Sequence, residues 1–222
     1  MPTHAAHAAH AAHPGPAEPK HVVVVGASWG GLHALTTIVR ALPAAFAAPV
    51  LIVQHRARDA ASLLAELLQD VTPLAVCEVE DKEPLRAAHV YVAPPDYHVL
   101  FDEGHFALST DDAVRYSRPS IDVALASAAD TYGARAVGVV LTGANEDGAA
   151  GLRRVVERGG WAVIQMPETA EVRTMPDAAL KAVRGSGSPR CVVAPLDGIA
   201  RELVALVDTG VPTEHAGGGA RA

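Results

Sequence analysis

Three side chains suited to acyl transfer follow three separate apolar runs of the sequence. Ser28 follows the first run, His55 follows the second, and Asp147 lies in the segment after a later one. A serine hydroxyl can act as a nucleophile, an imidazole can act as its general base, and a carboxylate can orient that imidazole. The three residue types together predict a hydrolytic site, provided that the fold brings them to one place.

The segment around Ser28, Gly26-Ala27-Ser28-Trp29-Gly30, fits the Gly-x-Ser-x-Gly turn between a strand and a helix. Small residues on both sides let the turn lift the hydroxyl clear of the backbone. A helix that begins near Gly30 aims its free N–H groups at the same place, which favours negative charge there. The alternative is a glycine-rich turn that binds a phosphate at the helix N-terminus.

His55 and Asp147 also have simpler interpretations. A histidine just past a strand is often a hydrogen-bonded surface residue, and an aspartate before Gly148 can cap the helix that follows. The order Ser28, His55, Asp147 differs from the α/β-hydrolase order of serine, acid, histidine. The shared position of all three residues after strands nevertheless favours a common site.

Helical and strand patterns alternate along the chain. The predicted strands are His21–Val25, Val50–Val53, Ala75–Val79, Val90–Ala93, Ala136–Leu141, Trp161–Gln165 and Val192–Ala194. The predicted helices are Leu32–Leu42, Ala60–Leu68, Ser120–Tyr132, Gly148–Glu157, Pro176–Val183 and Ile199–Val207. Strands that are apolar at every position and alternate with helices predict a parallel sheet covered on both faces.

The expected fold is therefore α/β, a doubly wound, mainly parallel sheet in a Rossmann-like three-layer arrangement. Val99–Phe101 and Phe106–Leu108 flank a turn with Gly104 and predict an added antiparallel hairpin. In an open parallel sheet, ligands bind outside the carboxyl ends of the strands. Ser28, His55 and Asp147 all follow such ends, so we expect them to meet there.

We expect the chain to divide into one domain, 21–208, and two tails, 1–20 and 209–222. The first tail repeats His4, His7, His10 and His13 between alanines, which is typical of a solvated low-complexity segment, with metal binding as the alternative. We expect the second to be flexible.

Composition narrows the function classes. Eighteen basic against 25 acidic residues give a net charge of −7, which argues against nucleic-acid binding. No apolar stretch reaches the ~18 residues of a membrane span, and no secretory signal is evident, so we expect a cytoplasmic protein without membrane insertion. Cys77 and Cys191 lie in apolar runs and predict buried free thiols.

The same motifs resemble the catalytic domain of the chemotaxis receptor protein-glutamate methylesterases, the CheB type. The resemblance spans roughly residues 21–205 in the family's order. It is carried by Val25-Gly26-Ala27-Ser28, Gly30-Gly31, Val53-Gln54-His55, Val90-Tyr91-Val92-Ala93-Pro94-Pro95 with His98, Ser117-Arg118-Pro119-Ser120-Ile121-Asp122, and Gly138-Val139-Val140-Leu141-Thr142-Gly143 with Asp147-Gly148-Ala149.

The resemblance implies a serine hydrolase that removes methyl groups from glutamate γ-methyl esters of chemoreceptors and releases methanol. Deamidation of receptor glutamines, the protein-glutamine glutaminase activity, is the related reaction. Ser28 matches the nucleophile, His55 the base and Asp147 the orienting acid. Backbone N–H groups of Ala144, in the Gly143–Asn145 loop, and from near Trp29 would hold the oxyanion. Neither a metal nor an organic cofactor is required.

The sequence departs from the family at several positions beside these residues. Trp29 replaces a usual threonine, and Ala144-Asn145 replaces a usual methionine and glycine. Arg56, where methionine is common, could grip an acidic receptor helix, act on the base His55 by like-charge repulsion, or be a solvated surface arginine. Near the end of the match, Val172–Pro176 keeps a Met-Pro and loses a usual Tyr-Gly. These changes concern the substrate more than the catalytic residues.

The resemblance also concerns partners and regulation. Chemotaxis members usually carry an N-terminal receiver domain, whereas residues 1–20 are too short for one, so we expect a standalone domain without control by phosphorylation in cis. A methyl-accepting receptor and an opposing glutamate methyltransferase are the implied partners. The alternatives are a repurposed or non-catalytic docking domain in a signalling complex and an esterase with a diverged substrate.

Overall fold

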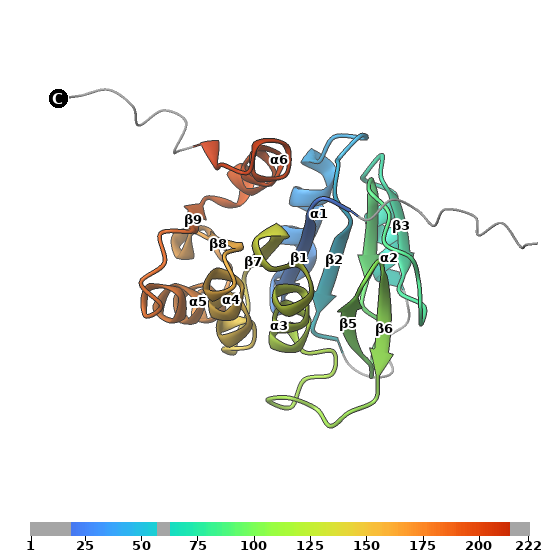
Figure 1. The fold of residues 1–222 in the computed structure, drawn as a ribbon, viewed down its shortest axis with the longest axis horizontal. Helices are drawn as coiled ribbons and strands as arrows, with labels where there is room; N and C mark the ends of the chain where they lie inside the picture. Colours follow the sequence, from blue (N-terminus) through green and yellow to red (C-terminus); the bar gives the residue numbers. More distant parts are fainter. Residues whose placement is uncertain (1–18, 57–62, 214–222) are drawn as a thin grey trace, which may run out of the picture.

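A computed structural model describes residues 19–56 and 63–213 (Figure 1). Its main sheet has seven strands, and every neighbouring pair of strands is parallel. In spatial order they are β3 (Ala75–Glu78), β4 (His89–Val92), β2 (Val50–Gln54), β1 (Val22–Ala27), β7 (Ala136–Val140), β8 (Trp161–Gln165) and β9 (Cys191–Ala194). The parallel sheet predicted from the apolar runs is confirmed.

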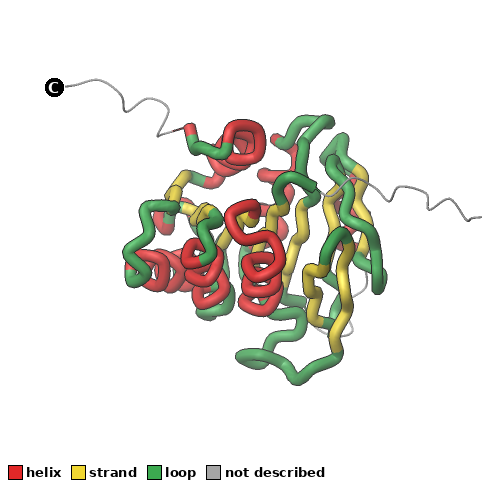
Figure 2. The backbone as a smooth tube through the Cα atoms, in the orientation of Figure 1, coloured by secondary structure: helices red, strands yellow, loops and turns green. Residues whose placement is uncertain are grey.

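Helices cover both faces of this sheet. One face packs against α1 (Gly31–Ala41), α2 (Leu63–Gln69) and α6 (Ile199–Thr209). The other packs against α3 (Ile121–Tyr132), α4 (Ala149–Glu157) and α5 (Thr174–Arg184), which lie side by side in Figure 1. Figure 2 shows the same layering by element type. The doubly wound three-layer fold is therefore confirmed.

The core on each face is aliphatic because successive strand residues point to opposite sides. In β1, Val23 and Val25 pack toward α1 and α6, whereas Val22 and Val24 pack toward α3. All six residues of β1 are buried, as expected for the central strand of a covered sheet.

The predicted hairpin is present as β5 (His98–Asp102) and β6 (His105–Ser109), joined antiparallel. It forms a two-stranded sheet of its own rather than extending the main one. Val99, Phe101 and Phe106 pack it onto the face that carries α3. Ser127 of α3 holds it there, accepting from the N–H of Phe101 and donating to its carbonyl.

One predicted detail differs from the structure, and two predictions fall wholly or partly outside the described residues. Cys77 and Cys191 are free thiols but only partly buried, because they lie on β3 and β9, the two edge strands of the sheet that the described residues form. The start of the predicted helix Ala60–Leu68 falls outside the described residues, and its remainder forms α2. The histidines of the first tail also lie outside the described residues.

The C-terminal end of the domain makes a hydrogen bond back to α6. Helix α6 ends at Thr209, and the N–H of Thr213 donates to the buried carboxylate of Glu202 at 2.9 Å. Short 3₁₀ turns at Gly133–Arg135, Pro167–Thr169 and Leu196–Gly198 complete the described secondary structure. None of the helices within residues 19–56 and 63–213 is long and apolar enough to cross a membrane.

Candidate active site

Ser28 directly follows β1 and lies at the carboxyl edge of the sheet, where the strand order reverses. The next strand, β2, lies on one side of β1, and β7 lies on the other. Such a reversal opens a crevice above the sheet, which is the usual ligand position in this class of fold. Asp147, in the loop after β7, and His55, after β2, therefore flank Ser28 from opposite sides.

The turn after Ser28 depends on Gly30. Its φ of 76° lies in the left-handed region, which glycine adopts without strain. A Cβ at this position would also approach the Cβ of Glu171 to 2.8 Å. Helix α1 begins at the next residue, and the N–H of Gly31 donates to the carbonyl of Ser28 at 2.9 Å. The predicted strand–turn–helix around the serine is therefore present.

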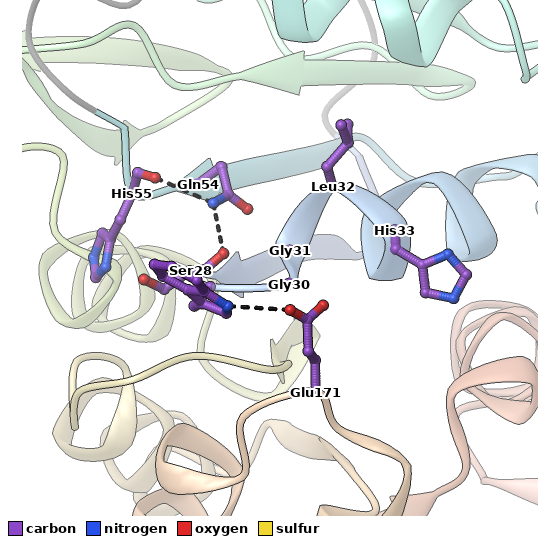
Figure 3. A pocket seen from close by; sticks show the side chains of 9 residues that line it. Ser28, Gly30, Gly31, Leu32, His33, Gln54, His55 and Glu171 are labelled. Carbon is purple, nitrogen blue, oxygen red and sulfur yellow. Dashed lines mark hydrogen bonds between the residues drawn. The ribbon is translucent and has the colours of Figure 1, made fainter.

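Backbone hydrogen bonds fix the loop of Ser28 against its neighbours. The N–H of Ser28 donates to the carbonyl of Thr142 at 3.0 Å, and the N–H of His55 donates to the carbonyl of Ala27 at 3.1 Å. The side-chain Nε2 of Gln54 donates to the carbonyls of Ser28 at 2.8 Å and His55 at 3.1 Å (Figure 3). The positions of Ser28 and His55 are thus set by the same short network.

His55 and Asp147 are joined directly. The distance from His55 Nε2 to Asp147 Oδ2 is 2.8 Å, and the aspartate is 1% exposed. A buried carboxylate beside an imidazole nitrogen favours the tautomer that carries its proton on Nε2. The lone pair of the ring is then on Nδ1.

Asp147 does not cap the helix that follows it. The N-cap of α4 is Gly148, and no side chain caps that helix. The carboxylate turns instead to the N-terminus of α3, where it accepts from the N–H groups of Ile121 at 2.8 Å and Asp122 at 2.9 Å. Its other donors are Ser120 Oγ at 3.0 Å and the N–H of Gly148 at 3.0 Å.

These contacts determine the charge of Asp147. Burial on its own raises the pKa of a carboxyl, but the hydrogen bond from His55 and the N–H groups of Asp122 and Ile121 outweigh it and hold the pKa of Asp147 below its usual value. The aspartate is therefore ionised beside the imidazole.

Ser28 lies beside His55 and Asp147, but its side chain is not hydrogen-bonded to either of them. Its side-chain hydroxyl makes no hydrogen bond with any residue in the described part of the chain. The nitrogen of His55 that faces away from Asp147, Nδ1, lies 3.3 Å from Nδ2 of Asn145. The structure therefore brings the three predicted residues to one edge of the sheet and joins two of them directly.

The residues expected at the oxyanion also lie at this edge. Ala144 is exposed in the loop between β7 and α4, and Trp29 is 65% exposed in the turn after Ser28. Among the described residues, neither backbone N–H donates to another group. Both are consequently free to donate to a ligand. The side chain of Asn145 accepts from the N–H of Asp147 through Oδ1 and points Nδ2 toward His55.

A pocket of about 580 Å³ opens beside Ser28. Figure 3 shows Ser28 and His55 at one end and His33 at the other. The indole Nε1 of Trp29 donates to Oε1 of Glu171 at 3.1 Å, so this pair forms one wall. The pocket thus has an aromatic and acidic side next to the serine.

Several residues of the site were not identified as such from the sequence. Gln54, Ser120 and Thr142 hold the loops or the aspartate, and Glu171 lines the pocket from the loop after β8. Ser120 could have been found, since it is the first residue of a predicted helix and serine is a preferred capping residue. Glu171 carries no such local pattern, because only the fold brings it to Trp29.

Arg56 is more buried than a solvated surface arginine. Its side chain is 9% exposed, and Nη2 donates to the carbonyl of Ala93 at 2.8 Å. The same nitrogen lies 3.5 Å from Glu78 Oε2. The guanidinium is therefore held between the ends of β3 and β4 and is not a solvated surface group.

Metal ligands are not grouped in the structure. Within residues 19–56 and 63–213, no three histidine, cysteine, aspartate or glutamate side chains lie together in a way that could hold an ion.

The doubly wound parallel sheet carries a serine turn and a histidine–aspartate pair at its carboxyl edge, and these are the groups that hydrolytic acyl transfer uses. The chain belongs to the CheB methylesterase family, whose sequence model matches residues 23–203. The crystal structure of the Thermotoga maritima CheB methylesterase catalytic domain superposes with a TM-score of 0.77 and 33% identity, covering 84% of this chain and 98% of that domain.

Curated relatives give the same result. A Leptospira interrogans protein is 42% identical over 161 residues, covering 72% of this chain and 83% of its own length. A protein-glutamate methylesterase/protein-glutamine glutaminase of Carboxydothermus hydrogenoformans is 40% identical, covering 85% of this chain and 56% of its own length. The protein-glutamate methylesterase FrzG of Myxococcus xanthus is 37% identical, and the corresponding shares are 87% and 57%. The chain thus spans little more than half the length of the latter two.

Proposed function

We propose that this chain hydrolyses γ-methyl esters of glutamate side chains on chemoreceptor-type proteins and releases methanol. The observation that carries the proposal is the 2.8 Å hydrogen bond between His55 and the buried Asp147 beside the turn of Ser28. The names of the Carboxydothermus and Myxococcus relatives support the same reaction.

In the first half of the reaction, Ser28 Oγ attacks the ester carbonyl carbon. Its proton passes to Nδ1 of His55, because Nε2 is bonded to Asp147. The negative charge on the carbonyl oxygen is held by the N–H groups of Trp29 and Ala144, and donors of this kind contribute most when they are already in place. The ionised Asp147 stabilises the imidazolium that forms.

In the second half, the imidazolium gives its proton to the leaving methoxide, and methanol departs. Water then attacks the acyl-enzyme while His55 takes a proton from it, and the return of that proton to Ser28 releases a glutamate carboxylate. A glutamine side chain would follow the same route and release ammonia, which supports deamidation as a second activity.

The proposal includes partners. The substrate is a methyl-accepting chemoreceptor or a similar signalling protein, and an opposing glutamate methyltransferase must supply the ester that this chain removes. The catalytic unit is 21–208, which agrees with the extent of the family match at residues 23–203.

The test is methanol release from methylated chemoreceptor membranes by the native chain and by Ser28→Ala. We expect the variant to lose at least about 1,000-fold in rate, as other serine nucleophiles do, while its thermal midpoint stays close to native, since the turn tolerates a small side chain. Equal release by both proteins would overturn the assignment of Ser28.

A diverged ester substrate is the second candidate, and the Trp29–Glu171 pair in the pocket wall favours it. A carboxylate there disfavours an anionic neighbour of the scissile ester. If the native chain releases no methanol, labelling of Ser28 by a fluorophosphonate would indicate such a substrate. Absence of labelling as well would indicate a docking domain.

A further inference from the structure

Asn145 lies directly against the nitrogen that the proposed mechanism uses as a base. Its Nδ2 is 3.3 Å from His55 Nδ1, and it is half-buried in the loop between β7 and α4. It is also the single asparagine among the 222 residues. Neither the mechanism above nor the expected role of this residue at the oxyanion uses that contact.

The orientation of the Asn145 amide is fixed by its other hydrogen bond. Oδ1 accepts from the backbone N–H of Asp147 at 3.1 Å, so the amide group that faces His55 must be the NH₂. An NH₂ can only donate. Nδ1 of His55 must then be the acceptor, in agreement with a proton on Nε2 facing Asp147.

A neutral imidazole has one lone pair in the plane of its ring, and two donors compete for it here. The first is Asn145 Nδ2, which holds it in the structure. The second is Ser28 Oγ, which must donate to the same nitrogen in order to be activated. Ser28 makes no side-chain hydrogen bond within the described residues, so the nitrogen is occupied by the amide.

We propose that Asn145 is a positioning residue that masks the base nitrogen of His55 until a substrate accepts its NH₂ group. This inference rests on the proposed function, since it assumes that Ser28 and His55 react together. An ester or amide carbonyl bound beside Ser28 and His55 gives the NH₂ another acceptor, and the lone pair of Nδ1 then becomes available to Ser28. The serine is thereby kept less reactive when the site is empty.

Two substitutions separate masking from a purely structural role. Asn145→Ala removes the donor to Nδ1 and also the acceptor for the Asp147 N–H. Asn145→Asp keeps that acceptor but places a carboxylate at Nδ1, which holds a proton on the nitrogen. Masking predicts that the alanine variant reacts faster than native and the aspartate variant slower. A structural role through the loop predicts the opposite order.

The first measurement is the second-order rate at which a small fluorophosphonate labels Ser28. We expect roughly a two- to tenfold increase in Asn145→Ala, the range that corresponds to one net hydrogen bond, and a decrease in Asn145→Asp. An unchanged or slower rate in Asn145→Ala, with a native-like circular dichroism spectrum, would overturn the inference. If the native chain is itself neither labelled nor active on receptor esters, the proposed function fails first.

A second measurement needs no substitution of Asn145. Because the chain has a single asparagine, ¹⁵N-asparagine labelling yields one side-chain NH₂ signal for this residue. We expect that signal to shift when the fluorophosphonate occupies the site, and to keep its native position in Ser28→Ala without a ligand. A signal that does not respond to the occupied site would contradict displacement of the amide.

Discussion

Five donors converge on the carboxylate of Asp147, and this residue shows how the site and the stability of the fold are coupled. Oδ2 accepts from His55 Nε2 and the Ile121 N–H, and Oδ1 accepts from Ser120 Oγ and the N–H groups of Asp122 and Gly148. The same carboxylate thus orients the proposed base and closes the N-terminus of α3.

We expect Asp147→Asn to lose both activity and stability. Whichever oxygen is replaced, an NH₂ group faces N–H donors in a buried site, so the free energy of unfolding should fall by about 2 kcal/mol or more at pH 7. Chemical denaturation measures this loss. Asp130→Asn is the matched control, because Asp130 pairs with Arg154 and Arg158 at the surface and should change stability by ~1 kcal/mol or less.

The effect of Asp147→Asn should also depend on pH in one direction. The pKa of Asp147 is lowered in the folded state, so its ionisation stabilises the fold fully above the unfolded value of about 3.9. That contribution is lost as the pH falls through the folded-state pKa. The difference in unfolding free energy between native and variant should therefore shrink on acidification, and a difference that grew would contradict the lowered pKa.

At the scale of the elements, three loops at the carboxyl edge are tied together by one buried side chain. Thr142, after β7, donates from its hydroxyl to the carbonyl of Trp29 at 2.9 Å and accepts from the N–H of Val172 at 2.9 Å. It is 1% exposed. The loops after β1, β7 and β8 thus depend on a hydroxyl that touches neither Ser28 Oγ nor His55.

Thr142→Val tests this connection with almost no change in shape. The loss of the hydroxyl leaves the N–H of Val172 and the carbonyl of Trp29 without their partner, so we expect a cost of about 1–3 kcal/mol in denaturant unfolding and a lower turnover rate. Thr37→Val is the control, since the Thr37 hydroxyl donates to the carbonyl of His33 within α1, and it should cost about 0.5 kcal/mol or less. Equal costs for both variants would mean that the loops do not rely on Thr142.

At the scale of the whole molecule, the two cysteines lie on the first and last strands of the main sheet. Cys77 lies on β3 and Cys191 on β9, six strand positions apart, or roughly 29 Å at about 4.8 Å per strand. A disulfide requires Cα atoms within about 7 Å, so the fold excludes one between them in the same molecule. Burial raises the pKa of both thiols, with Glu83 adding to the effect at Cys77.

Both thiols should therefore react slowly in the native protein. A raised thiol pKa leaves less thiolate at pH 8, and we expect disulfide reagents to titrate both cysteines roughly tenfold more slowly than in guanidinium. Reducing agent should leave the thermal midpoint unchanged. Fewer than two titratable thiols in a freshly unfolded, unreduced monomer would contradict this expectation.

Much of the fold and the candidate site followed from the sequence for a physical reason. Strands buried on both faces must be apolar at every position, as in Ala136–Val140, and amphipathic helices must alternate with them, so both patterns are visible locally. Ser28, His55 and Asp147 could be proposed because polar residues at the ends of parallel strands meet at one edge. The extent of burial of Cys77 and Cys191 could not, because edge positions depend on strand order.

The tertiary structure alone determined the contacts between loops that are distant in the sequence. The sequence contains Asn145, Glu171 and Arg56 but carries no local pattern that tells which partner each one takes. The side chain of Asn145 faces His55 because β2 and β7 lie on either side of β1, and Glu171 meets Trp29 because β8 follows β7 in the sheet. Hydrogen bonds act over about 3 Å, whereas sequence patterns determine only which face of an element is buried, so these pairings exist only once the sheet is assembled.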